Sequence, residues 1–173
     1  DIADIYNQYG NAKARVQLST DMNPGQLFMP IHWGDTASSH GKVCRIVSPE
    51  VDPISAQPEA KFTPVAIKPW AYTSEAIFLS REPIDTQAFE YWVQRQVNGG
   101  YLYYIAQAST DTALIDNIKP LAQVDVDNTR IEFNDNTQQQ FRCATMVNGE
   151  VNTLYIVAPR LADTDYAWLD NLL

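Results

Sequence analysis

The sequence reads GQLFMPIHWG over residues 25–34 and DPISAQPEAK over residues 52–61, and these two stretches decide the fold assignment. A mostly polar segment joins them, so that residues 34–60 are rich in Gly, Ser and Pro and contain the turn formers Asp52-Pro53 and Gln57-Pro58. A long loop of this kind in a compact domain is usually functional or covered by a ligand. We therefore interpret residues 34–60 as a binding loop rather than a simple connection.

The sequence on either side of this loop has the period of β-strands. Residues 1–7 and 13–19 alternate between apolar and polar side chains around a turn at Tyr9-Gly10-Asn11, which predicts a hairpin. After the turn at Asn23-Pro24-Gly25, residues 26–33 resemble a strand, and residues 61–68 resemble another.

The remainder of the chain mixes strand and helix patterns. Strands are predicted over residues 71–79, 101–108, 123–127 or beyond, 140–147 and 151–158. Helices are predicted over residues 83–97 (with Asp85 as the N-cap), 110–118 and 166–173. Asn148-Gly149 is the strongest hairpin signal in the chain. This part therefore reads as α+β.

Charge divides the chain in two. Residues 1–70 carry six Lys or Arg and seven Asp or Glu, whereas residues 71–173 carry six and fourteen. We place a domain boundary where Pro69 interrupts an apolar pattern, giving domains 1–69 and 70–173. A net charge of −9 disfavours a nucleic-acid partner. No apolar run approaches the ~18 residues of a membrane helix, so we expect no membrane partner either.

Recognisable catalytic and metal motifs are absent from the sequence. The 173 residues contain two cysteines, Cys44 and Cys143, with no CxxC pair, which is typical of reduced thiols in a cytoplasmic protein. His32 and His40 lack two further ligands at the spacing of a zinc site. We therefore predict no catalytic residue and no metal ligand in this chain.

The two quoted stretches resemble the C-terminal molybdopterin-dinucleotide-binding domain of the molybdenum bis-MGD oxidoreductases. Within that superfamily they are most similar to the assimilatory nitrate reductase catalytic subunit, which carries a G-x-x-F-x-P-x-H-W strand, a loop, and D-P-x-S-x-x-P-x-x-K. The resemblance covers residues 1–68, and residues 71–173 are similar to the region that follows. It implies a β-rich α+β chain, with a partial double-psi β-barrel followed by a small α+β domain with antiparallel hairpins.

The resemblance also implies roles for individual residues. The positions it assigns to the cofactor, molybdopterin guanine dinucleotide (Mo-bis-MGD), are Lys61, Gln57, Glu59, Cys44 and His40. His40 and Cys44 depart from the family, which usually places asparagines in this loop. His32 and Trp33 match the strand end that faces the substrate funnel. Read without the resemblance, Lys61 is a solvated strand-edge lysine and His32 is a hydrogen-bonded histidine beside a buried tryptophan.

Two functions remain open at this point. In the first, the chain is a cytoplasmic, non-catalytic fragment of a nitrate reductase; its partners are the rest of that chain and an electron-donor protein, and the iron–sulfur cluster lies outside it. In the second, the acidic C-terminal unit is a docking module for an electron-transfer partner or for dimerisation. Half of a double-psi barrel, packed on the C-terminal unit or on a second copy, should expose apolar side chains, namely Ile2, Ile5, Val16, Phe28 and Val65.

Overall fold

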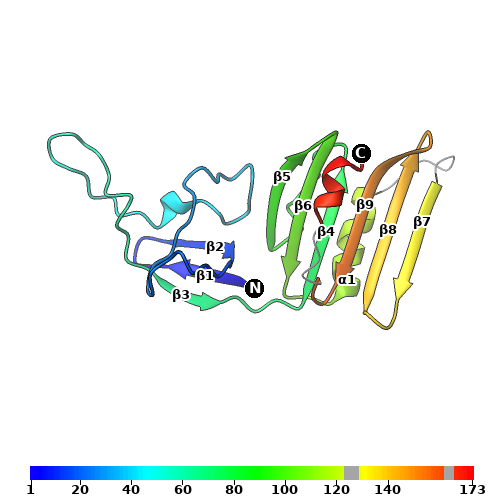
Figure 1. Cartoon of the computed structure of the whole chain (residues 1–173), viewed down its shortest axis with the longest axis horizontal. Coiled ribbons are helices and arrows are strands. Elements are labelled where there is room, and N and C mark those ends of the chain that lie inside the picture. The colour runs from blue at the N-terminus through cyan, green and yellow to red at the C-terminus, as the bar shows by residue number, and fades with distance from the viewer. Residues whose placement is uncertain (123–128, 162–165) are drawn as a thin grey trace. The chain divides into compact units, whose positions relative to one another are not determined.

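The computed structural model describes residues 1–122, 129–161 and 166–173. It divides into two compact units, unit 1 over Asp1–Ala71 and unit 2 over Tyr72–Leu173. Each unit has its own antiparallel sheet (Figure 1). The chain is therefore β-rich, as predicted.

Unit 1 is a three-stranded sheet that carries long loops. Its strands are β1 (Ile2–Tyr6), β2 (Asn11–Arg15) and β3 (Ala66–Pro69), in the order β2-β1-β3. The predicted hairpin is confirmed, with β1 and β2 paired from Ile2 opposite Arg15 to Tyr6 opposite Asn11. The second strand begins and ends earlier than the alternation over residues 13–19 predicts.

The predicted strand over residues 26–33 is wrong, because this segment is irregular and pairs with no described strand. Pro24 and Pro30 lack the N–H that a ladder requires. The apolar side chains that suggested a strand are instead in solvent, with Leu27, Phe28 and Ile31 52%, 79% and 57% exposed. The predicted strand over residues 61–68 shortens to β3, which begins after Pro64.

The predicted exposure of apolar residues in unit 1 is correct in part. Val16 and Phe28 are exposed, but Ile2 and Ile5 are buried and Val65 is half-buried. Ile5 packs against Val43 and Ile46, both from the polar segment after residue 34, and Val65 lies against the same cluster. The loop therefore covers part of the sheet that we expected to be open. The described residues of unit 1 form no closed barrel.

Unit 2 is a six-stranded antiparallel sheet with the order β5-β6-β4-β9-β8-β7 (Figure 1). Its strands are β4 (Ser74–Ser80), β5 (Tyr91–Val97), β6 (Gly100–Gln107), β7 (Thr129–Asp135), β8 (Gln140–Val147) and β9 (Glu150–Ala158). Its helices are α1 (Asp111–Ile118) and the short 3₁₀ turns η2 (Lys119–Ala122) and η3 (Ala167–Asn171).

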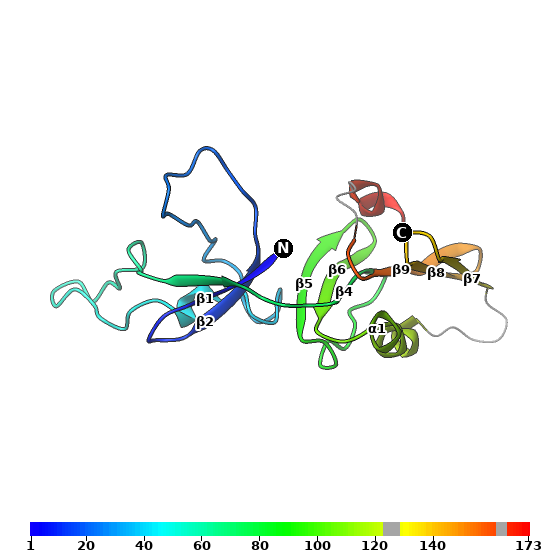
Figure 2. The same ribbon diagram turned by 90° about the horizontal axis from the view of Figure 1, so that it is seen from below.

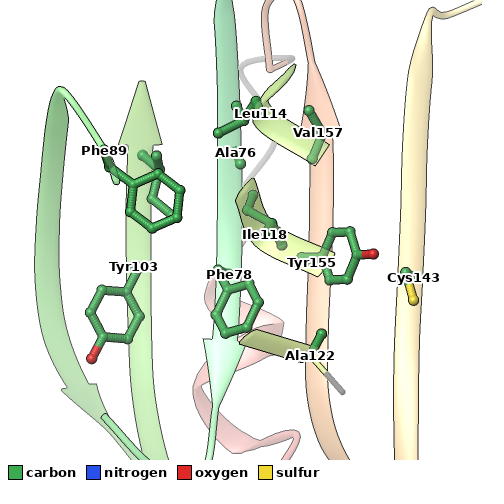
Figure 3. Close-up of a cluster of buried hydrophobic side chains, with 11 residues drawn as sticks. Ala76, Phe78, Phe89, Tyr103, Leu114, Ile118, Ala122, Cys143, Tyr155 and Val157 are labelled. Carbon is green, nitrogen blue, oxygen red and sulfur yellow. The ribbon is translucent and has the colours of Figure 1, made fainter. Parts of the chain in front are cut away.

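Helix α1 and the turn η3 lie on opposite faces of this sheet (Figure 2), and each face has its own apolar core. On one face, Leu114 and Ile118 of α1 lie over the β-sheet core that includes Phe78 and Tyr155 (Figure 3). The rings of Phe78 and Tyr155 are stacked, with centroids 5.9 Å apart. On the opposite face, Leu169 of η3 closes a smaller cluster. The central strand β4 is consequently buried along its whole length.

The predicted helix over residues 83–97 is wrong, because its second half is strand β5. Tyr91, Trp92 and Val93 are aromatic or β-branched and therefore favour strands. The two residues Asn98-Gly99 then link Val97 directly to Gly100 of β6, forming a hairpin. The apolar side chains of this segment fit both the spacing of a helix and the alternation of a strand. Pairing with β6 stabilises the strand.

Other predictions for unit 2 hold. Residues 140–147 form β8 as predicted, and Thr110 caps α1 by accepting a hydrogen bond from the Ala113 N–H. Asn148 and Gly149 join β8 to β9 with φ of 53° and 83°. The predicted helix over residues 166–173 is only the 3₁₀ turn η3. The strand predicted over residues 123–127 lies outside the described residues.

Candidate cofactor-binding site

The loop over residues 34–46 is attached to the hairpin at three points. The backbone N–H of Lys13 donates to the carbonyl of His40 at 2.9 Å, and the Asn7 amide donates to the carbonyl of Ile46 at 2.7 Å. Val43, in the 3₁₀ turn η1 (Val43–Arg45), packs with Ile46 against Ile5. The loop therefore has a fixed path although it contains no strand or α-helix.

Polar side chains inside this loop hold its shape. The Asp35 carboxylate accepts from Lys42 and from Arg45, each at 3.2 Å. The buried Ser38 hydroxyl accepts from the Gly41 N–H at 2.9 Å, and a Cβ at Gly41 would overlap with that hydroxyl. The two basic residues of the loop are thus engaged with its own acid.

A second loop segment, residues 51–58, is a turn built on Asp52. The Asp52 carboxylate accepts from the backbone N–H groups of Ile54 and Ser55 at 3.0 and 2.7 Å, and from the Ser55 hydroxyl at 3.0 Å. These bonds, the Ser55 N–H first, lower the pKa of Asp52. A bridge between Val51 and Pro58 closes the turn. Asp52 of the second motif therefore shapes the backbone rather than facing a ligand.

The family-matched side chains at the end of this turn are available to a ligand. Gln57, Glu59 and Lys61 are exposed. Their side chains make no hydrogen bond or ion pair with another residue that the structure describes. An amide, a carboxylate and an ammonium together offer donors and acceptors to a polar heterocycle and a cation to a phosphate.

His40 is the most unusual polar group of the first loop. Its Nδ1 atom is buried and has no hydrogen-bond partner among the described residues. Burial lowers the pKa of His40, and the nearby charges of Lys13 and Arg45 lower it further, while Asp4 opposes them. The imidazole is therefore neutral near pH 7, so that one ring nitrogen donates and the other accepts. This nitrogen therefore has a hydrogen-bonding capacity that no described residue uses.

The other predicted site residues are less constrained. Cys44 lies in η1 with an exposed side chain. His32 and Trp33 are exposed in the irregular segment, so the strand end that should present them to a funnel does not form. His40 and Cys44 belong to the first loop, whereas Gln57, Glu59 and Lys61 lie at the end of the second loop segment or just after it. No described contact joins these two groups.

Asn7, Asp35 and Asp52 hold the site in shape. The sequence identifies Asp52 as a turn former but assigns no such role to Asn7 or Asp35. Of these three residues, only Asp52 carried a usable signal in the sequence. An Asp that precedes Pro is typical of an Asx turn, in which the Asp side chain accepts from the backbone N–H two residues later, here that of Ile54. In the described ranges, no group of three or more His, Cys, Asp or Glu residues is placed to hold a metal ion. None of the helices in those ranges has both the length and the apolar character that crossing a membrane demands.

Comparison with known proteins supports this reading of unit 1. Residues 1–64 match a family model, the Molydopterin dinucleotide binding domain, and both motifs and both loops lie within the match. The nitrate reductase of Klebsiella oxytoca is 32% identical over 99 residues. The resemblance to nitrate reductases is confirmed. Because unit 1 ends at Ala71, an alignment of 99 residues must include part of unit 2.

The nitrate reductase relatives are much longer than the region they share with this chain. The Klebsiella alignment covers 57% of this chain and 11% of the enzyme. The nitrate reductase of Synechocystis sp. (strain ATCC 27184 / PCC 6803 / Kazusa) is 37% identical over 60 residues, which is 35% of this chain and 8% of that protein. The chain thus spans about a tenth of the relatives it matches. No solved structure matches it.

Proposed function

We propose that this chain is the C-terminal cofactor-binding part of an assimilatory, cytoplasmic nitrate reductase and is not catalytic alone. The observation that carries the proposal is the pair of loops within the matched residues 1–64. Their backbone is held by Asn7, Asp35 and Asp52, whereas the side chains that match the family's cofactor contacts are left unpaired. The form of the cofactor that we propose is Mo-bis-MGD.

In this proposal the two loops bind different parts of the cofactor. Lys61 would place its ammonium on the pyrophosphate, while Gln57, Glu59, His40 and Cys44 would face the pterin edge. The bound cofactor would supply the two-electron reduction of nitrate to nitrite, with electrons from an iron–sulfur cluster elsewhere in the enzyme. The residues of this chain bind and orient; none transfers a proton or an electron.

We also propose that unit 1 is one part of a double-psi β-barrel completed by other residues of the reductase. The exposed apolar side chains of Leu27, Phe28 and Ile31 support this, because an exposed apolar surface of this kind usually marks an interface. Strand pairing with that missing part would explain why residues 26–33 have strand-like alternation but no partner here.

The proposal is tested in the reductase that contains this chain, by replacing Lys61 with Ala. Molybdenum content and nitrate reduction should both fall tenfold or more, because one charge-assisted contact is worth about 1.5–3 kcal/mol. Lys119→Ala, which removes an exposed lysine of unit 2, is the matched control and should change neither. Wild-type molybdenum content and activity in Lys61→Ala would show that the assigned role is wrong.

A second function rests on the charge of unit 2. Residues 71–173 carry fourteen acidic and six basic residues, and such an excess favours docking of a basic electron-transfer protein. Binding of such a donor should weaken steeply between low and physiological salt. A donor whose affinity is indifferent to ionic strength would contradict the docking function.

A further inference from the structure

Strand β7 is an open edge of the unit 2 sheet. Among the described strands it pairs with β8 alone (Figure 1). Every residue from Thr129 to Asn134 is exposed. Ile131 and Phe133 are each 55% exposed. An edge strand with free backbone groups and apolar side chains is a template for pairing with another strand.

The apolar side chains of β7 extend a row that runs across the sheet. Ile131 lies opposite Ala144 of β8, which lies opposite Leu154 of β9, and Leu154 lies opposite Leu79 of β4. Cross-strand neighbours project from the same face, so this row shares the face that η3 covers. Leu79 and Leu154 belong to the cluster under Leu169, whereas Ile131 does not. The row therefore ends uncovered at β7.

We propose that a second copy of this chain pairs with β7 through its own β7. The two strands run antiparallel about a two-fold axis normal to the sheet at Ile131, so that Ile131 faces Ile131 of the second copy. Arg130 then faces Glu132 of the second copy, and Glu132 faces its Arg130. The two sheets would join into one, with the apolar rows continuous across the joint.

The charges of β7 select this register. A two-fold axis normal to the sheet keeps the same face of both sheets on one side. Residues that lie opposite each other project from that same face, so one residue of β7 must lie opposite itself in the second copy. Centring on Glu132 would place two carboxylates opposite each other, which is destabilising. Centring on Phe133 would place Ile131 opposite Asp135. Of these three registers, the one at Ile131 opposes unlike charges and keeps an apolar centre.

Arg130 and Glu132 already form an ion pair within β7. The Arg130 guanidinium lies 2.6 Å from Glu132 and donates to the hydroxyl of Tyr155 on β9 at 3.2 Å, so it reaches over β8 and must turn toward the open edge when the second copy pairs. Pairing would build an alternating ring of two guanidinium groups and two carboxylates. A single pair of short strands buries little surface, so we expect a dissociation constant between about 1 μM and 1 mM.

Sedimentation analysis of the whole chain from a few micromolar to about 1 mM tests the proposal. The weight-average mass of the wild type should rise with concentration from the monomer value of 19.5 kDa toward twice that value. Glu132→Arg should weaken association at least tenfold, because it opposes like charges. The exchange variant Arg130→Glu/Glu132→Arg should restore association, since it keeps unlike charges opposed in this register. Gln96→Lys on β5, the other edge strand, is the matched control and should associate like the wild type.

Circular dichroism before each run shows whether a variant is folded. A wild type that stays monomeric across this range overturns the proposal. So does a folded Glu132→Arg variant that associates like the wild type, because pairing would then lie elsewhere. A folded exchange variant that stays monomeric contradicts the register and with it the proposed interface. The outcome is independent of the cofactor proposal, which concerns unit 1.

Discussion

At the residue scale, His40 combines a buried Nδ1 that lacks a described partner with a lowered pKa. Burial is the main cause of that shift, and Lys13 and Arg45 add to it. A group whose pKa is lower in the folded state binds fewer protons there than in the unfolded chain. The stabilising contribution of neutral His40 is therefore complete above the ordinary value of 6.5 and is lost as the pH falls through the folded pKa.

We accordingly predict that His40 titrates below pH 6.5 in the folded chain. Nuclear magnetic resonance of the imidazole carbon-bound protons, assigned with a His40→Gln variant, measures this midpoint directly. Unit 1 should also lose stability as the solution is acidified through that range. A midpoint at or above 6.5 would mean that the ring is solvated, and the pterin-edge role of His40 would be unsupported.

The residues that shape the site were harder to predict than the residues that match the family. Lys61 and Gln57 stand in a motif that can be read locally. Asn7 and Ile46, by contrast, lie 39 positions apart, and only the folded loop brings them within 2.7 Å. No pattern in a single sequence encodes such a long-range contact, so a fixed path for residues 34–46 could not be derived from it.

At the element scale, turn chemistry was the most reliable signal. Asn148-Gly149 predicted the β8–β9 hairpin, since two successive residues with positive φ match the twist of a hairpin. The helix predicted over residues 83–97 is wrong because its apolar residues fit the period of a helix and also the period of a strand. Pairing with β6 determines which of the two structures forms. The strand predicted over residues 26–33 is wrong because a strand needs a neighbouring strand to pair with, and no described strand pairs with this segment.

Two glycines of unit 2 should differ in their sensitivity to substitution. Gly149 has a φ of 83° but open space around it, so Gly149→Ala should cost about 1 kcal/mol of backbone strain. At Gly100 a Cβ would overlap with the Ser80 carbonyl and Leu173, so Gly100→Ala should cost about 3 kcal/mol. Urea unfolding followed by circular dichroism measures both, and equal costs would contradict the packing at Gly100.

At the scale of the whole molecule, the two cysteines report on the two units. Cys44 is exposed in unit 1, whereas Cys143 is buried in unit 2, where burial raises the pKa of its thiol. One thiol per chain should therefore react rapidly with a maleimide at neutral pH. The second should react only when unit 2 opens, for instance in urea. Mass spectrometry with peptide mapping identifies each site, and rapid labelling of Cys143 would contradict the described core.

In the proposed function, the whole chain is part of a larger enzyme. The match to the Molydopterin dinucleotide binding domain covers both loops of unit 1, while the exposed apolar surface of unit 1 and the open edge of unit 2 leave room for further contacts. The family resemblance could be read from two short motifs, because those motifs keep their spacing around the loop. A partner for the exposed Phe28 could not be predicted from the sequence, because exposure of a side chain does not identify what covers it.

The central claim is that the side chains left unpaired by the loops hold the pterin dinucleotide. The most direct measurement is the pterin and molybdenum bound per chain in the reductase when Gln57, Glu59 and Lys61 are all changed to Ala. We predict that both fall together by at least tenfold while the protein stays folded. Wild-type amounts of pterin and molybdenum in the folded triple variant would contradict the account.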